Sequence, residues 1–301
     1  MTQKCYLCDS KNHKKRKGSV RDSAPLSVLE CKSCSFVFLS ANLHTDEAFY
    51  KEGNMHGNLN VETWLETTKK DDHRRFESLK KKIKDKNILD FGCGNGGFLR
   101  LARNAAKKAE GIELQENLQN YFIKNNLKVY KNINQTEEKY DYITLFHVIE
   151  HLASPKKMLA KLAQNLSDGG EIIIETPNSD DVLLKAYKNK GFSNFTYWSC
   201  HPYLFNEKTL KKLVEDSGFK VTSFERIQRY GLVNHLYWLI FNKPGGHKKW
   251  ARFDFGFINF IYGKILSLFK MTDTIVIKIR RSGFNPTTLT RQEIREILVQ
   301  Q

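Results

Sequence analysis

The sequence predicts an α/β protein whose core is a doubly wound, mostly parallel sheet, with a small four-cysteine segment ahead of it. Two observations support this prediction. From residue 87 onward, short apolar stretches that suit buried strands alternate with stretches whose apolar residues recur at helical spacing. Such alternation is typical of a parallel sheet with helices on both faces. Within residues 1–40, by contrast, two Cys-x-x-Cys pairs stand in a stretch with little core-forming periodicity.

The expected elements begin with a charged amphipathic helix over residues 61–83. Strands are then predicted at 87–91, 109–113, 127–131, 141–146 and 170–176, and helices at 97–107, 115–124 and 155–166. An aromatic stretch over 192–205 precedes a helix at 207–217 and strands at 219–227 and 273–281. Between these last two strands lies an aromatic and basic insertion, residues 231–270, which we expect to form a lid or an interfacial, membrane-docking helix pair.

Charge and composition narrow the class of protein. The net charge is +16, and residues 1–21 carry seven Lys or Arg against one Asp, while residues 243–281 carry nine against two. Such stretches suit anionic partners or a solvated basic surface. No apolar run reaches the roughly 18 residues that span a bilayer, and the start lacks a signal-peptide core. We therefore expect the cytoplasm, where the six cysteines stay reduced.

A glycine-rich loop follows the first predicted strand and opens a helix. Gly92, Gly94 and Gly97 also fit the dinucleotide-binding spacing, so the loop alone does not identify a cofactor. Asp90 favours a different ligand, because a carboxylate at the strand end suits the cationic amino end of S-adenosylmethionine and not a pyrophosphate. Glu113, at the end of the second strand, can accept hydrogen bonds from two ribose hydroxyls.

Three segments resemble motifs of class I S-adenosylmethionine-dependent methyltransferases. Residues 88–96, Ile-Leu-Asp-Phe-Gly-Cys-Gly-Asn-Gly, resemble the first motif of this family. Residues 139–152 resemble the fourth-strand motif of its ubiquinone-biosynthesis-like branch, and residues 166–178 resemble the fifth-strand motif. The resemblance covers about residues 86–228 and resumes at Asp273. It implies a Rossmann-like sheet of seven strands whose last strand runs antiparallel.

The resemblance also implies which residues contact S-adenosylmethionine. These residues are Asp90, Gly92, Cys93, Gly94, Gly96, Glu113 and Leu114, with His147 nearby. One departure from the family pattern is that no acidic or adenine-binding residue follows the third strand, where Asn132 is a weak substitute.

The two cysteine pairs predict a metal site. Cys5 and Cys8 form one Cys-x-x-Cys pair, and Cys31 and Cys34 form the other. Four thiolates on two such turns can surround one Zn²⁺ tetrahedrally, which leaves no open position and indicates a structural role. Similar zinc-binding segments precede the methyltransferase domain of sugar methyltransferases.

Three residues are candidates for acid–base chemistry. A hydroxyl acceptor benefits from a base with a pKa near neutrality, which favours His151 and His201. Glu150 adjoins His151, and on a helical turn both would share a face with His147. The alternative interpretations are that Glu150 and His151 only organise a loop and that His201 is a core histidine. A second metal near His147, Glu150 and His151 also stays open.

The expected function is methyl transfer to a small, phosphorylated or carbohydrate-type acceptor in surface-glycan or secondary-metabolite biosynthesis. One alternative is an RNA methyltransferase, which the cysteine pairs and positive charge would suit. It is disfavoured because the sequence lacks an Asn/Asp-Pro-Pro-aromatic motif and a Pro-Cys pair. Another alternative is a non-catalytic scaffold or membrane-docking protein, at the inner face of the membrane. The oligomeric state is not predicted.

These inferences divide the chain into five parts. A zinc-binding segment covers residues 1–45, a helical linker 46–85 and a cofactor-binding core 86–230. The insertion covers 231–270, and a final strand with a C-terminal tail covers 271–301.

Overall fold

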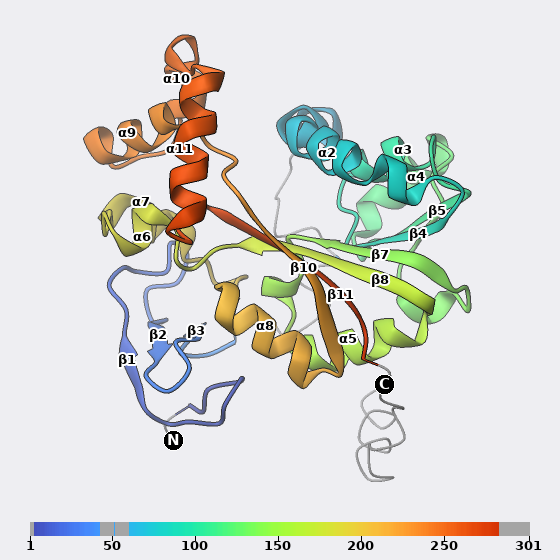
Figure 1. Cartoon of the computed structure of the whole chain (residues 1–301), viewed down its shortest axis with the longest axis horizontal. Coiled ribbons are helices and arrows are strands. Elements are labelled where there is room, and N and C mark those ends of the chain that lie inside the picture. The colour runs from blue at the N-terminus through green and yellow to red at the C-terminus, as the bar shows by residue number, and fades with distance from the viewer. Residues whose placement is uncertain (1–2, 43–50, 52–59, 283–301) are drawn as a thin grey trace.

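A computed structural model describes residues 3–42, 51 and 60–282 of the chain (Figure 1). Its main sheet has seven strands in the order β10-β11-β8-β7-β4-β5-β6. Only β11, the last strand along the chain, runs antiparallel to its neighbours β8 and β10. The predicted doubly wound, mostly parallel sheet with an antiparallel last strand is therefore confirmed. The predicted C-terminal tail lies almost wholly outside the described residues.

The strands lie close to their predicted positions. They are β4 (Asn87–Phe91), β5 (Lys108–Ile112), β6 (Val129–Tyr130), β7 (Tyr140–Phe146), β8 (Leu166–Pro177), β10 (Phe219–Ile227) and β11 (Thr274–Arg281). β8 is longer than expected, since it begins at Leu166. β6 is shorter, and pairs with β5 through only two residues, Val129 and Tyr130.

Helices cover both faces of this sheet. On one face lie α2 (Val61–Ile83), α3 (Gly97–Ala102) and α4 (Gln119–Lys124), and on the other α5 (Pro155–Gln164) and α8 (Glu207–Asp216) (Figure 1). Alternate strand residues supply the two cores. Ile88 of β4 packs with α2 and α3, whereas Leu89 faces the cluster that includes residues of α5 and α8. α3 is shorter than predicted because the chain turns after Ala102.

Three short 3-10 turns connect elements of the core. They are η1 (Glu116–Leu118), η2 (Ile133–Gln135) and η3 (Ile149–His151). The predicted helix at 115–124 is thus divided between η1 and α4.

A second sheet, which the sequence does not predict, joins the N-terminal segment to the core. It contains β1 (His13–Lys15), β2 (Val28–Cys31), β3 (Val37–Leu39) and β9 (Tyr203–Leu204). β9 comes from the aromatic stretch of the core, and Val37 and Phe38 of β3 pair with it. The cysteine segment therefore packs on the core, and shares one hydrophobic cluster with it.

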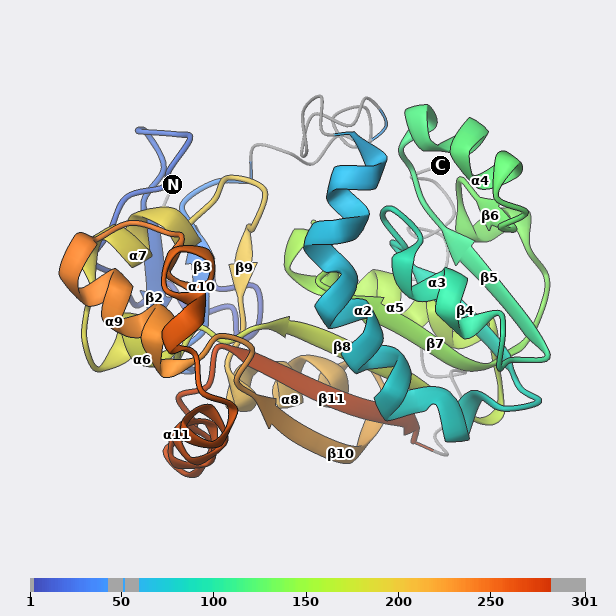
Figure 2. The ribbon, with the colours of Figure 1, turned by 90° about the horizontal axis from the view of Figure 1, so that it is seen from above.

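The insertion between β10 and β11 is helical. It contains α9 (Leu232–Phe241), α10 (Gly246–Lys249), η4 (Ala251–Phe253) and α11 (Gly256–Leu268), beside α6 (Val182–Lys185) and α7 (Lys190–Thr196) (Figures 1 and 2). Most apolar side chains of α11 are exposed, unlike those of a lid packed on the domain. Among the described residues, no helix has the length and apolar character that crossing a membrane requires.

Candidate functional site

The glycine loop turns sharply between β4 and α3. Gly92, Gly94 and Gly96 have φ values of 72°, 53° and 73°, in the left-handed region that glycine tolerates best. A Cβ on Gly92 would lie 2.6 Å from Val148 Cγ2, so a side chain there would collide with its neighbour. The Gly94 amide donates to Glu113 Oε2 at 2.8 Å. The loop is therefore closed onto the end of β5.

Two buried carboxylates flank this loop. Asp90 lies in β4 and accepts a hydrogen bond from the Thr144 hydroxyl at 2.7 Å. Burial raises the pKa of Asp90 to about 7, although the hydrogen bond from Thr144 opposes this rise. Burial also raises the pKa of Glu113. A bound cation at this place would favour the ionised form of Asp90.

The other predicted cofactor residues lie around the same loop. Cys93 is buried, and its sulfur would lie 2.7 Å from a Cβ built on Gly111 of β5. Leu114 follows β5 and is half-buried. The structure thus brings all seven residues predicted for the loop and the end of β5 into one region.

Helix α2 covers the glycine loop. Figure 2 shows α2 crossing over the sheet, where its early turns approach the loop. A Cβ on Gly94 would lie 3.2 Å from the Trp64 ring, and the Asn95 amide donates to the Thr68 hydroxyl at 3.0 Å. The sequence predicted α2 only as part of a helical linker, yet this helix forms a wall of the candidate cofactor site.

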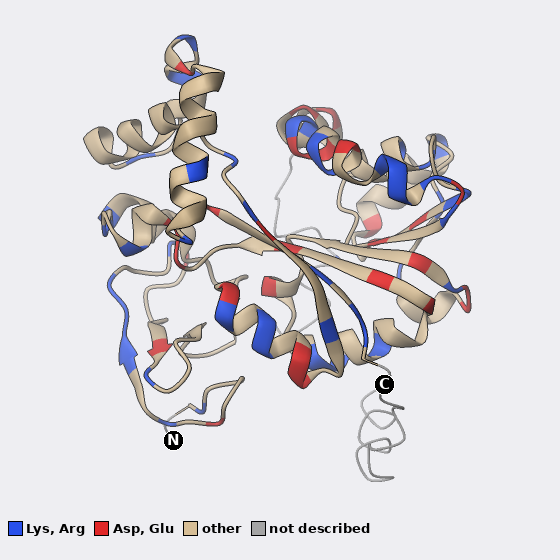
Figure 3. Ribbon diagram, in the orientation of Figure 1, with Lys and Arg blue, Asp and Glu red and all other residues tan. Residues whose placement is uncertain are grey.

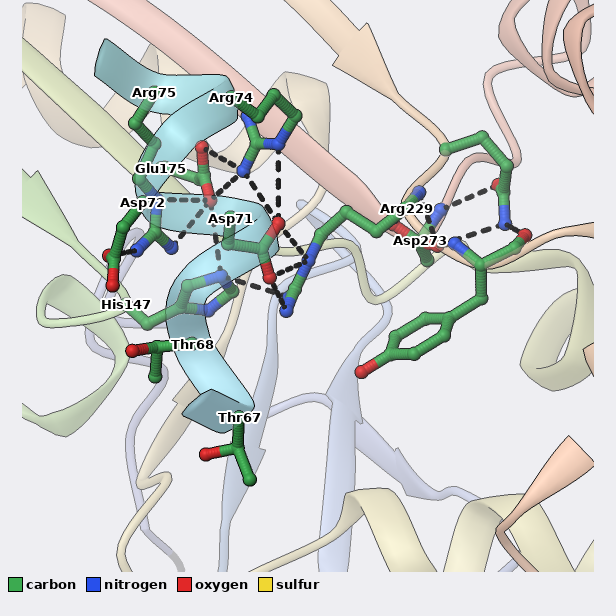
Figure 4. Close-up of polar contacts among 12 residues, drawn as sticks. Thr67, Thr68, Asp71, Asp72, Arg74, Arg75, His147, Glu175, Arg229 and Asp273 are labelled. Atoms are coloured by element: carbon green, nitrogen blue, oxygen red, sulfur yellow. Dashed lines mark hydrogen bonds and ion pairs between the residues drawn. The ribbon is translucent and has the colours of Figure 1, made fainter. Parts of the chain in front are cut away.

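Glu175, at the end of β8, anchors α2 to the sheet (Figure 4). Its side chain is 1% exposed, and it accepts hydrogen bonds from Arg74 and Arg75, both at 2.8 Å. Burial alone would raise the pKa of Glu175, but the His147 hydrogen bond and the two Arg charges hold it well below its usual range. The sequence did not predict this role, and its one indication was a glutamate near the end of an apolar, Ile-rich strand.

His147 joins this network from the end of β7 (Figure 4). Its Nδ1 lies 3.2 Å from Glu150 Oε1, and its Nε2 lies 3.4 Å from Glu175 Oε1 and 3.1 Å from Arg229 Nη1. Burial would lower the pKa of His147, but its hydrogen bonds to Glu150 and Glu175 raise it. His147 therefore links the α2 anchor to the acid–base residues described next.

Glu150, His151 and His201 lie close together. The sequence predicted that Glu150 and His151 are neighbours, but it could not predict that His201 joins them. Glu150 and His151 lie on η3, and His201 precedes β9. One ligand atom from each lies within 4.8 Å of the others, and the two imidazole rings are 4.5 Å apart. Such a group could accept and pass on a proton, or hold a divalent metal ion.

The protonation states of this group follow from its surroundings. His151 Nδ1 lies 2.8 Å from the Cys200 carbonyl oxygen, so Nδ1 carries the hydrogen and Nε2 is the basic nitrogen. Burial lowers the pKa of both His151 and His201. Burial would raise the pKa of Glu150, but His147 lowers it to about 2. Two neutral imidazoles therefore lie beside an ionised carboxylate at neutral pH.

The four cysteines of the N-terminal segment form a compact cluster. Their sulfurs all lie within 4.8 Å of one another, with Cys5 Sγ 3.6 Å from Cys34 Sγ and Cys8 Sγ 3.5 Å from Cys31 Sγ. Tetrahedral Zn²⁺ with Zn–S bonds of about 2.3 Å requires S···S distances of roughly 3.8 Å. The cluster therefore has the donor set and the size that a structural zinc requires.

The same segment holds the loop that carries His201. Asp22 accepts hydrogen bonds from the amide and hydroxyl of Ser199, at 3.0 and 2.5 Å. The Arg21 guanidinium lies 4.2 Å from the centre of the Trp198 ring. Together with the β3–β9 pairing, these contacts place the basic N-terminal segment beside the acid–base residues.

A family model described as a methyltransferase domain matches residues 63–224, more than half of the chain. The chain belongs to the methyltransferase domain family. The prediction of an S-adenosylmethionine-dependent methyltransferase is thereby confirmed at the level of the family. Its ubiquinone-biosynthesis-like branch and the roles of its individual site residues stay predictions.

Curated relatives match part of this methyltransferase. A tRNA U34 carboxymethyltransferase of Nautilia profundicola is 28% identical over 160 residues, which are 48% of this chain and 53% of the relative. A protein of the same name from Glaesserella parasuis is 30% identical over 186 residues, covering 56% and 58% of the two chains. The chain spans about half the length of the curated relatives it matches.

Solved structures include a SAM-dependent methyltransferase from Archaeoglobus fulgidus. It is 18% identical, with a TM-score of 0.46, and the match covers 78% of this chain and all of the other. This weak likeness adds nothing to the fold described above.

The relatives correct one prediction from the sequence. The predicted acceptor was a phosphorylated or carbohydrate-type molecule in glycan or metabolite synthesis. This prediction is contradicted, because several matched relatives are named tRNA U34 carboxymethyltransferase. Judging RNA the less suitable partner was wrong for the same reason. The two missing motifs concern exocyclic base amines and cytosine carbon, and so did not exclude other RNA acceptor atoms. Cysteine pairs and positive charge serve phosphosugars and RNA equally well.

Proposed function

We propose that this chain is an S-adenosylmethionine-dependent methyltransferase that acts on RNA, with tRNA as the substrate class. The observation that carries this proposal is the match of its core to several proteins named tRNA U34 carboxymethyltransferase. The net charge of +16 supports it, since RNA is a polyanion.

The position of the positive charge also supports an RNA substrate. Residues 1–21 carry seven Lys or Arg, and Arg21 and the neighbouring Asp22 contact the loop 197–201. Lys15 and Lys17 are exposed on this N-terminal segment. An RNA strand that contacts Arg21 would pass close to the loop that carries His201, where its acceptor atom is needed.

The residues around the glycine loop fit S-adenosylmethionine. Asp90 would face the cationic amino end, Glu113 would accept from the ribose, and Gly92, Gly94 and Gly96 would allow close approach, near Cys93, Leu114 and His147. The cofactor supplies an activated methyl group on a sulfonium, whose departure as a neutral sulfide needs little assistance. The protein then has to orient the acceptor and receive its proton.

A group of three residues would take part in receiving that proton. His201 is proposed as the base, with His151 as its neighbour and Glu150 as the carboxylate that stabilises the charge formed on them. The lowered pKa of His201 keeps the imidazole neutral and able to accept a proton at neutral pH.

The four cysteines are proposed to hold one structural Zn²⁺. Four thiolates complete a tetrahedral shell, so the metal would not take part in group transfer. Its role would be to keep the N-terminal segment folded against β9 and the loop carrying His201.

Incubation of the full chain with labelled S-adenosylmethionine and unfractionated tRNA tests this proposal. Nucleoside mass spectrometry should find a modified uridine at position 34, and RNA binding should weaken steeply with salt. A parallel reaction with a donor carrying a carboxymethyl group on its sulfonium decides which group is transferred. The matched control is Gly94→Arg, which should abolish labelling because its side chain would meet Trp64. A protein that binds the cofactor yet labels no RNA would contradict an RNA substrate.

A further inference from the structure

The helical unit inserted between β10 and β11, residues 232–270, presents a large apolar surface to solvent. On α11, the side chains of Phe257, Phe260 and Leu268 are 76%, 63% and 79% exposed, and Ile240 on α9 is 60% exposed. Leu266 is the only buried residue of α11. Soluble proteins rarely expose so many large apolar side chains together without a partner.

The unit is nevertheless firmly built onto the core. Trp238 is buried against Phe192 and Phe195, and the Asn189 amide donates to its carbonyl oxygen at 3.0 Å. Leu266 packs against Val182 and Leu183 of α6. Its exposed residues are therefore held on a fixed, folded support, which projects away from the seven-stranded sheet (Figure 1).

The helical unit is also strongly basic. The unit contains six Lys or Arg and one acidic residue, Asp254. All six cations are exposed: Lys243, Lys248, Lys249, Arg252, Lys264 and Lys270. Figure 3 shows the helices of this unit mostly in tan, with few Lys, Arg, Asp or Glu residues along them. Lys264 lies 5.4 Å from the Phe260 ring centre, so charge and apolar side chains occur on one surface.

We infer that this helical unit docks the protein on an anionic lipid bilayer. Aromatic and aliphatic side chains would enter the boundary between headgroups and acyl chains, while Lys and Arg pair with lipid phosphates. α11 has 13 residues, about 20 Å of helix, which is shorter than the roughly 30 Å hydrocarbon core. The helix therefore lies in the membrane surface and does not cross it.

Two other occupants fit this surface less well. A second copy docked through the same face would bring six cations against six cations, because a two-fold interface pairs a patch with itself. RNA would satisfy the cations but leave Ile240 and Leu268 without partners, since aliphatic side chains neither stack flat on bases nor donate hydrogen bonds.

Vesicle sedimentation of the full chain tests the inference, without cofactor or RNA, so its outcome is separate from that of the proposed activity. We expect binding to phosphatidylcholine vesicles that contain phosphatidylglycerol, and little binding to phosphatidylcholine alone. Combining Phe257→Asp with Leu268→Asp should weaken this binding about 10-fold or more. The matched control is Ile123→Asp, at a residue of α4 that is 74% exposed, and it should bind like the unaltered protein.

A charge-reversal pair completes the experiment. Lys248→Glu, Lys249→Glu and Lys264→Glu together should weaken binding about 10-fold or more, whereas Lys81→Glu, Lys82→Glu and Lys86→Glu, on exposed residues elsewhere, should not. Equal binding to both vesicle types would overturn the inference. So would a lipid-free dimer that dissociates in the Phe257→Asp, Leu268→Asp variant, or RNA binding lost in that variant.

Discussion

Arg75 of α2 and Glu175 of β8 are joined by hydrogen bonds at 2.8 and 3.1 Å, although 100 residues separate them in the sequence. The Arg75 guanidinium also lies 4.6 Å from the centre of the Phe146 ring. This contact holds α2 in the position where Trp64 covers the glycine loop. The sheet therefore sets the position of a helix that walls the candidate cofactor site.

Replacing Glu175 with Gln should destabilise the fold. The change leaves Arg74, Arg75 and His147 without their shared anion in a buried place, which costs about 3 kcal/mol in the free energy of unfolding. Chemical denaturation measures this loss. The matched control is Glu77→Gln, where an exposed glutamate pairs with Lys80 on the same helix, and it should change stability by less than about 0.5 kcal/mol. Equal stability of the two variants would show that Glu175 does not anchor α2.

The affinity for S-adenosylmethionine should rise with pH. Burial raises the pKa of Asp90 to about 7, so its carboxyl is mostly protonated below that pH and ionised above it. Only the ionised form attracts a cation, and we expect affinity to increase about eight-fold between roughly pH 6 and pH 7.5. Calorimetry at several pH values measures it. Asp90→Asn should bind weakly and lose most of this dependence, whereas a flat profile for the unaltered protein would argue against a role of Asp90.

His201→Ala should lower turnover about 100-fold or more and leave cofactor affinity within a few-fold. The loss follows from removing the neutral imidazole proposed to take the acceptor proton. Steady-state kinetics with the acceptor that supports turnover measures both parameters, together with their pH profile. The control is His73→Ala, since His73 is exposed on α2 and its Nδ1 lies 2.9 Å from the Lys69 carbonyl oxygen on the same helix. Nearly unchanged turnover in His201→Ala would make His151 the better candidate base.

Protein purified without chelators should contain one zinc per chain, and Cys5→Ser should lose it. Because β3 pairs with β9, loss of the metal should lower turnover more than it lowers cofactor affinity. Elemental analysis and kinetics measure these effects. Cys200→Ala is the control, since this buried thiol lies outside the cluster and should keep the metal. Absence of zinc from the unaltered protein would refute the site.

The sequence by itself determined the order of the core elements and the bounds of several of them. A short apolar stretch located β4 with its observed ends, β10 was likewise predicted with its observed ends, and the helical spacing of apolar residues located α2 from Val61 to Ile83. Gly92 and Gly94 were identifiable because a strand-to-helix turn needs residues that accept positive φ. These are local properties, which neighbouring residues decide.

The tertiary structure alone decided what lies around that core. Arg75 meets Glu175, and His201 meets His151, only because the strand order brings the ends of β7 and β8 together beneath α2 and beside β9. The pairing of β3 with β9 turned a separate cysteine segment into a support for the site. The exposure of Phe257 and Leu268 also depended on the tertiary structure, since a sequence shows that a residue is apolar but not whether another element covers it.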